Sequence, residues 1–182
     1  MNKLSWFSVL AVSLWIIVPV RALAAPAAAK PIEVTVNLVS ADGVGKAIGT
    51  ITLKSGKDGV TLAPKLKELP PGEHGLHLHE KGSCDPADKD GKKTAAAAAG
   101  PHFDPDATKA HKGPGGGGHK GDLPKLVVSD KGEAKQKMEV KGVTLEDFQG
   151  KSLMIHAGGD SYSDTPKPLG GGGDRIACGV VK

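Results

Sequence analysis

Hydrophobic and polar residues alternate along much of the chain after residue 31. Ile32, Val34, Val36 and Leu38 are separated by polar neighbours, and this period of two is typical of a half-buried β-strand. Similar alternation or short apolar runs predict seven more strands, over residues 48–53, 60–66, 75–79, 123–128, 134–140, 152–156 and 176–181. The only helix-like run, residues 94–99, is too short to form a layer. The pattern therefore predicts an all-β domain.

Turn signals between these strands indicate how they connect. Asp42-Gly43, Asp58-Gly59 and Lys131-Gly132 are dipeptides that favour tight turns between antiparallel strands. Eight short strands joined in this way predict an eight-stranded antiparallel barrel or sandwich.

Two long segments, residues 80–122 and 157–174, interrupt the strand pattern. Each contains four consecutive glycines, at 115–118 and at 170–173, which as such are typical of flexible linkers. Long loops inside a compact domain are usually functional, however. Because residues that carry candidate chemistry follow each glycine run closely, His119 after the first and Arg175 after the second, we predict two functional loops.

The N-terminal residues have the pattern of an export signal. Lys3 precedes an apolar stretch over residues 4–20, and Ala22-Leu23-Ala24 provides a small-residue cleavage pattern. The alternative is a membrane anchor, for which the apolar stretch is only about the minimum length. We predict a cleaved signal peptide at 1–24, a disordered tail at 25–31, and a single domain at 32–182 in an exported protein.

Charge and cysteine content add two constraints. The formal net charge of +4 is too small to indicate binding to nucleic acid, and no stable membrane association is expected of the mature domain. Cys84 and Cys178 are the only cysteines. In an oxidising compartment they favour a disulfide, with free thiols or a pair of soft metal ligands as the alternatives.

The first group of candidate metal ligands lies on a predicted strand. His77 and His79 are two positions apart, so a strand presents both side chains on one face. His74 has the opposite parity. We interpret it as a hydrogen-bonded buried histidine that supports the site from behind.

The second group lies in the long loop before residue 123. His102, His111, His119 and Asp122 provide three imidazoles and one carboxylate, a complete tetrahedral set for a structural zinc ion. Zinc binding would also order a loop that has little core of its own. The alternative is a solvated loop that happens to contain histidines.

His156 ends the predicted strand at 152–156. Together with His77, His79 and one loop histidine it completes a set of four nitrogens, which suits Cu(II). Six histidines and Asp122 must then serve both metals, so one ligand has to be shared. His102, at the start of the histidine-containing part of the loop, is the candidate.

Five strings extend this interpretation to a family. GEHGLHLHEKGSC, AGPHFDP, HKGPGGGGHKGDLP, LMIHAGGDSYSD and PLGGGGDRIACGV resemble, in order and spacing, the bacterial periplasmic copper/zinc superoxide dismutases. The resemblance covers nearly the whole mature chain. It implies a Greek-key fold, a periplasmic location, and conversion of superoxide to dioxygen and hydrogen peroxide by alternating Cu(II) and Cu(I).

The resemblance also implies residue roles. The copper ligands would be His77, His79, His102 and His156, and the zinc ligands would be His102, His111, His119 and Asp122. Asp160 would link the rings of His77 and His111 from behind. Arg175 would border the channel to copper, and Cys84 and Cys178 would form the disulfide within the subunit.

The zinc loop departs from the family pattern at three positions. Lys112 and Lys120 replace an acidic and an apolar residue of many bacterial relatives, and Gly116 stands where dimeric relatives often have an aromatic residue. The metal ligands are unaffected. The dimer contact is put in doubt, so the chain is expected to be a monomer or a homodimer.

Two other functions would use part of the same set of residues. An exported protein that buffers or delivers copper and zinc would need the ligands but not Arg175. A zinc hydrolase is disfavoured, because the zinc set leaves no vacant position and no glutamate lies beside His77 and His79 as a base.

Overall fold

The computed structural model describes residues 29–182. Its strands are β1 (Ile32–Ser40), β2 (Gly43–Ser55), β3 (Gly59–Leu66), β4 (Gly72–His74), β5 (Leu76–His79), β6 (Ala87–Lys89), β7 (Lys92–Thr94), β8 (Leu126–Val128), β9 (Met138–Lys141), β10 (Ser152–His156) and β11 (Arg175–Val180). The helical elements are α1 (Leu145–Phe148) and two 3-10 turns, η1 (Ala97–Ala99) and η2 (Pro168–Gly171). The predicted signal peptide lies outside the described residues. Within them, no helix has the length and apolar character needed to span a membrane.

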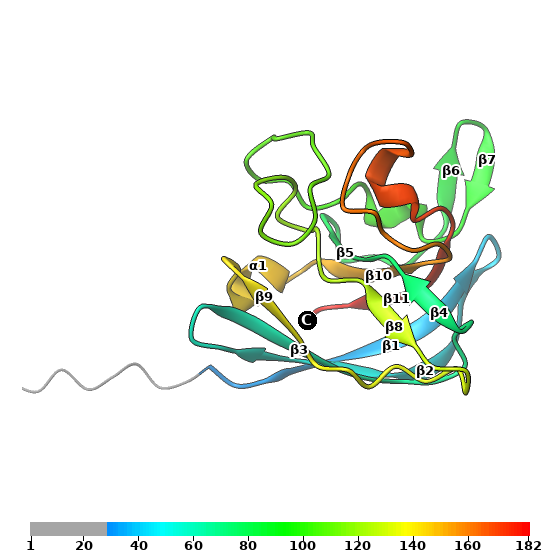
Figure 1. Cartoon of the computed structure of the whole chain (residues 1–182). Coiled ribbons are helices and arrows are strands. Elements are labelled where there is room, and N and C mark those ends of the chain that lie inside the picture. The colour runs from blue at the N-terminus through cyan, green and yellow to red at the C-terminus, as the bar shows by residue number, and fades with distance from the viewer. Residues whose placement is uncertain (1–28) are drawn as a thin grey trace, which may run out of the picture.

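Seven strands form one curled antiparallel sheet in the order β5-β10-β11-β1-β2-β3-β9 (Figure 1). β4 and β8 form a second, two-stranded ladder. The sheet encloses a core of Val, Leu and Ile with Phe148 as its largest fully buried side chain. The predicted all-β antiparallel architecture is confirmed, and β1 begins at Ile32, where the first strand is predicted.

The strand predicted at 75–79 begins one residue later, as β5, and an unpredicted short strand, β4, precedes it. Gly75 separates the two strands because its backbone bonds elsewhere: its N–H donates to the carbonyl of Gly158 (2.8 Å), and its carbonyl accepts from the N–H of His156 (2.9 Å). These bonds hold the segment at 157–159 beside the start of β5.

Two predicted strands are shorter in the structure. The strand predicted at 123–128 begins only at Leu126, two residues after Pro124, which has no N–H to donate. The strand predicted at 134–140 is reduced to an isolated bridge at Ala134 followed by β9 from Met138. Residues 135–137, between them, lie opposite Pro64 of β3.

The predicted loops contain regular structure that the sequence analysis did not include. β6 and β7 form a small hairpin within residues 80–122, and η2 lies within residues 157–174. Figure 1 shows both beside each other above the sheet. α1 begins with a capping box at Thr144, whose N–H donates to Asp147 Oδ2 at 2.8 Å.

The predicted disulfide between Cys84 and Cys178 is confirmed. It joins the start of the first long loop to β11, and both residues pack in a small buried cluster with Ala96, Ala99 and Met154.

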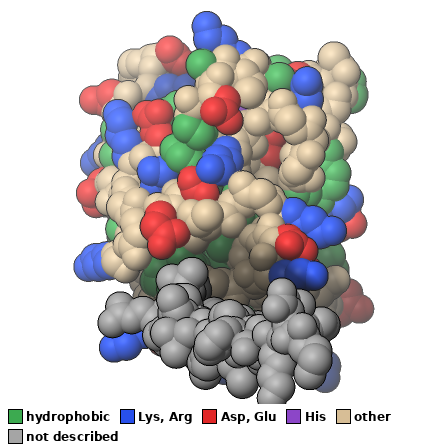
Figure 2. Space-filling model, turned by 90° about the vertical axis from the view of Figure 1, so that its left-hand side faces the viewer, with side chains coloured by type: hydrophobic (Ala, Val, Ile, Leu, Met, Phe, Trp, Pro, Cys, Tyr) green, Lys and Arg blue, Asp and Glu red, His purple; other side chains and the backbone are tan. Residues whose placement is uncertain are grey.

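Figure 2, which views the molecule from the left-hand side of Figure 1, shows basic and acidic side chains interspersed and almost no histidine. All the candidate ligands are buried except His119, which is half-buried.

Candidate metal centre

β5 and β10 provide the rigid side of the site. His77 pairs with Met154 and His79 with Ser152 across the antiparallel ladder. Every residue of both strands is buried. His77 and His79 lie on one face of β5, as their spacing predicts, and His156 ends the neighbouring strand.

The first long loop is attached to the other edge of β5. Leu78 donates its N–H to the carbonyl of Gly121 (2.9 Å) and accepts from the N–H of Phe103 (2.8 Å). Isolated bridges pair His77 with Asp122 and His79 with His102. Two loop segments that are 20 residues apart are thereby held directly beside the strand histidines.

The first ligand group is His77, His79, His102 and His156, whose donor atoms all lie within 4.8 Å of one another. Three of its nitrogens, Nδ1 of His77 and Nε2 of His79 and His156, are buried without a hydrogen-bond partner. The other nitrogen of each ring donates to Asp160 Oδ2 (2.8 Å), to the Gly100 carbonyl (2.7 Å) and to the Gly173 carbonyl (3.1 Å) respectively. Buried unpaired polar atoms are costly, and here they converge as metal ligands would.

The second ligand group is His102, His111, His119 and Asp122. Oδ1 of Asp122 lies 3.1, 2.9 and 3.2 Å from Nδ1 of His102, His111 and His119. Nδ1 of His111 makes no hydrogen bond despite this proximity. Three nitrogens and one carboxylate oxygen thus face a common point, which matches the ligand types of a closed zinc site.

His102 is the only residue in both groups. Its ring centroid lies 4.0 Å from that of His77 and 5.3 Å from that of His119. The described residues therefore provide two four-ligand groups joined at His102, as the number of candidate ligands requires.

Asp160 connects the two groups from behind. Its Oδ2 lies 2.8 Å from Nε2 of His77 and its Oδ1 lies 2.7 Å from Nε2 of His111. In both rings the nitrogen opposite to Asp160 faces the ligand group. Asp160 therefore orients one ring of each group, and no third metal is needed to explain its position.

The histidine pKa values of the site shift in two directions: burial lowers some of them, and contact with carboxylates raises one. Burial lowers the pKa of His102 to about 4 and that of His156 to about 3, and it lowers the pKa of His79 as well. His111 is also opposed by burial, but its contacts with Asp122 and Asp160 outweigh this and raise its pKa to about 9. Near pH 7 the first three rings are neutral, whereas His111 is protonated when no metal is bound.

Arg175 lies where β11 begins, paired with His156 across the ladder. Its Nη1 donates to the carbonyl of Ala96 (2.6 Å) and its Nη2 to that of Gly100 (2.7 Å). The Gly100 carbonyl also accepts from Nδ1 of His79. The guanidinium is half-buried and burial lowers its pKa, so a fixed cation is held beside the first ligand group.

His74 is placed as a supporting residue. It is 2% exposed, and its two ring nitrogens each lie 2.8 Å from a carbonyl oxygen, of His156 and of Pro70. Neither nitrogen faces a ligand group. The ring therefore links the end of β10 to the turn before β4.

Two further residues, Tyr162 and Asp164, position the site although the sequence pattern did not single them out. Tyr162 has a left-handed backbone (φ 57°), its N–H donates to Asp160 Oδ1 (2.7 Å), and its hydroxyl accepts from the N–H of Lys125 (3.0 Å). Asp164 Oδ2 accepts the N–H of His111 (2.8 Å). Both belong to the string DSYSD, in which polar residues at every second position after Asp160 were the available signal.

The three departures in the zinc loop leave the ligands in place. Lys112 donates its backbone N–H to Asp122 Oδ2 (3.1 Å), which any residue except proline could do. Lys120 Nζ lies 2.7 Å from Asp147 Oδ1 and so connects the loop to α1. Gly116 is exposed.

Comparisons with known proteins agree with this geometry. A family model described as copper/zinc superoxide dismutase matches residues 47–181. The Cu-Zn superoxide dismutase of Escherichia coli K12 is 52% identical over 171 residues, 93% of this chain and 98% of the relative. Superoxide dismutase 2 of Salmonella typhimurium is 54% identical over 151 residues, 82% and 87% of the two chains.

Solved structures extend the comparison to the fold. The Cu/Zn superoxide dismutase from Brucella abortus superimposes with a TM-score of 0.82 at 42% identity, over 84% of this chain and all of the other. The solution structure of the monomeric enzyme from Salmonella enterica gives 0.74 at 52% identity, also over 84% of this chain and all of the other. The predicted Greek-key barrel is confirmed.

Proposed function

The chain belongs to the copper/zinc superoxide dismutase family. On that premise we propose which of its residues bind each metal, which one donates a proton and which one attracts the substrate. The enzyme converts two superoxide anions and two protons into dioxygen and hydrogen peroxide, with copper and zinc as cofactors. Copper, when bound, supplies one-electron redox chemistry, and zinc supplies a fixed positive charge beside it.

The ligand assignment rests on the buried nitrogens that lack hydrogen-bond partners. We assign His77, His79, His102 and His156 to copper, and His102, His111, His119 and Asp122 to zinc. The observation that carries the assignment is that these two groups share one ring, His102, and that His77, His79, His111 and His156 each direct an unpaired buried nitrogen into them. Binding a metal would remove the cost of those unpaired atoms.

The remaining contacts fix which nitrogen of each ring is available. The Gly100 and Gly173 carbonyls accept from Nδ1 of His79 and His156, so the lone pair of each ring lies on Nε2. Asp160 accepts from Nε2 of His77, which leaves Nδ1 for the metal. These acceptors hold the rings in one orientation and one tautomer before any metal binds.

We propose that His102 handles a proton and Arg175 the substrate anion. Burial lowers the pKa of His102 to about 4, so its ring is neutral near pH 7 and keeps a single N–H, which we assign as the proton donor to the reduced product. Arg175 is held by two loop carbonyls and presents a positive charge that attracts a small anion to the first ligand group. The alternative of a protein that only stores metal has no use for this arginine.

The proposal is tested by measuring copper and zinc per chain together with superoxide removal by the same sample. We expect about one equivalent of each metal by the ligand count and removal that depends on copper. Full occupancy of both metals without superoxide turnover would favour the storage protein. Turnover that does not depend on copper would contradict the ligand assignment.

We also propose that the mature protein is periplasmic and begins near Ala25. Support comes from the signal-like pattern of residues 1–24 and from the disulfide, which is typical of oxidising compartments. The intact mass of the exported protein tests the cleavage site. Sedimentation of the same sample distinguishes the two expected states, monomer and homodimer.

A further inference from the structure

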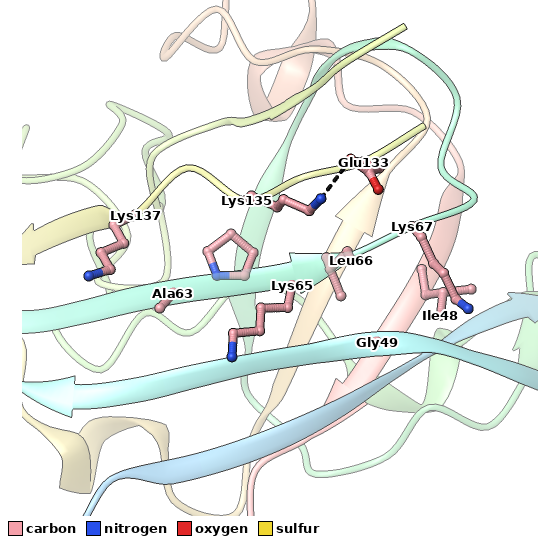
Figure 3. A pocket seen from close by; sticks show the side chains of 10 residues that line it. Ile48, Gly49, Ala63, Lys65, Leu66, Lys67, Glu133, Lys135 and Lys137 are labelled. Carbon is pink, nitrogen blue, oxygen red and sulfur yellow. Dashed lines mark hydrogen bonds and ion pairs between the residues drawn. The ribbon is translucent and has the colours of Figure 1, made fainter. Parts of the chain in front are cut away.

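A groove on the sheet lies away from the metal centre. It has a volume of about 420 Å³, within the range of small-ligand sites. Its lining comes from β2, β3 and the segment that precedes β9, and consists of Ile48, Gly49, Ala63, Pro64, Lys65, Leu66, Lys67, Glu133, Lys135 and Lys137. Figure 3 shows it from close by. In Figure 1 these elements are at the bottom of the molecule and the ligand-bearing loops at the top.

The groove exists because the ladder between β3 and β9 opens. Leu62 pairs with Met138, and pairing is recovered only at the bridge between Leu66 and Ala134. Pro64 lies in the middle of the gap and has no N–H to donate to a partner strand.

The surface between the lysines is low and apolar. Ala63, which is partly exposed, has only a methyl group. Ile48 and Leu66 are at most 2% exposed and lie beneath this surface as part of the hydrophobic core. The surface open to a ligand is therefore formed by Ala63 and the aliphatic stems of the lysines.

The rim of the groove is strongly basic. Four of the ten lining residues are lysines and one is a glutamate, whereas the whole chain has 24 basic and 20 acidic residues among 182. Lys135 is paired with Glu133 (2.7 Å). Within residues 29–182, no ion pair involves Lys65, Lys67 or Lys137, and all three are exposed.

We propose that this groove binds a single-chain amphipathic anion, such as an alkyl phosphate or alkyl carboxylate. The hydrocarbon chain would cover Ala63 and the aliphatic stems of the lysines, and the charged head would lie among the ammonium groups of Lys65, Lys67 and Lys137. Lysine recognises phosphate and carboxylate groups as a point charge. Apolar walls with a few convergent polar groups are typical of ligand sites.

Two other roles for the lysines fit less well. Steering of superoxide concerns the opposite side of the molecule, and it would not require an apolar strip between the lysines. Contact with the same groove of a second copy would bring two unpaired lysine clusters together, and like charges oppose such an interface.

The test uses octyl phosphate, below its micelle concentration, with the metal-loaded protein. Calorimetry should show that octyl phosphate binds more tightly than inorganic phosphate, which lacks the alkyl chain. Octyl phosphate should also bind more tightly than octyl glucoside, which lacks the negative charge. Amide NMR signals of Leu66 and Ala134 should shift, measured with copper reduced. Superoxide removal should not change.

The paired variant Lys65→Gln, Lys137→Gln should weaken octyl phosphate binding by about fivefold, since two exposed charge contacts are lost. The matched control is Lys54→Gln, Lys141→Gln, which removes two exposed lysines of the same sheet outside the groove. The control should bind like the unchanged protein.

Several results would overturn the proposal. These are equal binding of octyl phosphate and inorganic phosphate, equal binding of octyl phosphate and octyl glucoside, and unchanged affinity in the Lys65 and Lys137 variant. Retention of the protein by phosphatidylglycerol vesicles without binding of monomeric octyl phosphate would show a general attraction of lysines to an anionic surface, and this would also exclude the groove as a ligand site.

Discussion

The two ligand groups that we assign to copper and to zinc are supported in different ways. His77, His79 and His156 stand on paired strands that are buried throughout. His111 and His119 lie on a loop of the 80–122 segment, and their positions depend on hydrogen bonds that Asp160, Asp164 and the carbonyl of Ala110 accept from them. The strand ligands are placed by the barrel itself, whereas the loop ligands are placed by contacts that metal binding must reinforce.

The largest effect is expected from His77→Ala. This substitution removes a strand ligand while His102, His111, His119 and Asp122 remain, so superoxide removal should fall on the order of 100-fold with zinc content nearly unchanged. Metal analysis and activity on the same preparation provide the measurement. Equal loss of both metals would show that the strand and loop groups are not separable.

Asp122→Ala should mainly affect the ligand group on the loop. Zinc affinity should fall strongly and the melting temperature by about 10 °C or more, because zinc binding free energy contributes to the order of the loop. Some copper-dependent activity should survive, since all four copper nitrogens are still present. Scanning calorimetry with and without a chelator measures the effect, and an unchanged melting temperature would contradict a structural role for zinc.

The two groups should also differ in proton release. His111 is protonated in the metal-free protein up to a pKa of about 9, above its usual value, so its proton stabilises the metal-free fold below about pH 6.5 and this contribution is lost as the pH rises through 9. Zinc must displace that proton. Zinc affinity should therefore rise about tenfold per pH unit between pH 7 and 9, measured by competition titration. If zinc affinity does not change between pH 7 and 9, the ring of His111 is already neutral in the metal-free protein.

Arg175→Ala should lower kcat/KM about tenfold without loss of copper, because the guanidinium acts on the anion. The same variant should lose most of the dependence of the rate on ionic strength. Copper content is the control. Loss of copper would instead assign Arg175 to holding the loop carbonyls of Ala96 and Gly100.

The smallest effect is expected from Tyr162→Phe. It removes the acceptor for the N–H of Lys125 but keeps the ring and the backbone bond to Asp160, so zinc affinity should fall about two- to fivefold. The absorption spectrum of cobalt in the zinc site would report a change in ligand geometry. If affinity and spectrum both match those of the unchanged protein, the hydroxyl does not position the loop.

The candidate ligands that the structure brings together could be predicted, because residue type and spacing single them out. His77 and His79 follow from the strand period, and the loop histidines together with Asp122 form a complete ligand set. The β6–β7 hairpin was missed because its strands have almost no apolar residues, although Asp90-Gly91, both with positive φ, was a turn signal.

Other features depend on tertiary contacts that a pattern does not contain. The break at Gly75 is set by its bonds to Gly158 and His156. The left-handed conformation of Tyr162 is similarly specified by its partners, Asp160 and Lys125, because an isolated tyrosine would avoid it. Such features can be found only once the loops are placed on the sheet.

The pairing of β1 with β11 also affects how the protein is made. The first and last strands are neighbours in the sheet, and the partner of Cys84 lies four residues from the C-terminus of the chain. A chain that is exported N-terminus first, as we propose, cannot pair β1 with β11, or form the disulfide, until the residues of β11 have also been exported. Such long-range closure slows folding, so we expect the barrel to close only after export of both strands.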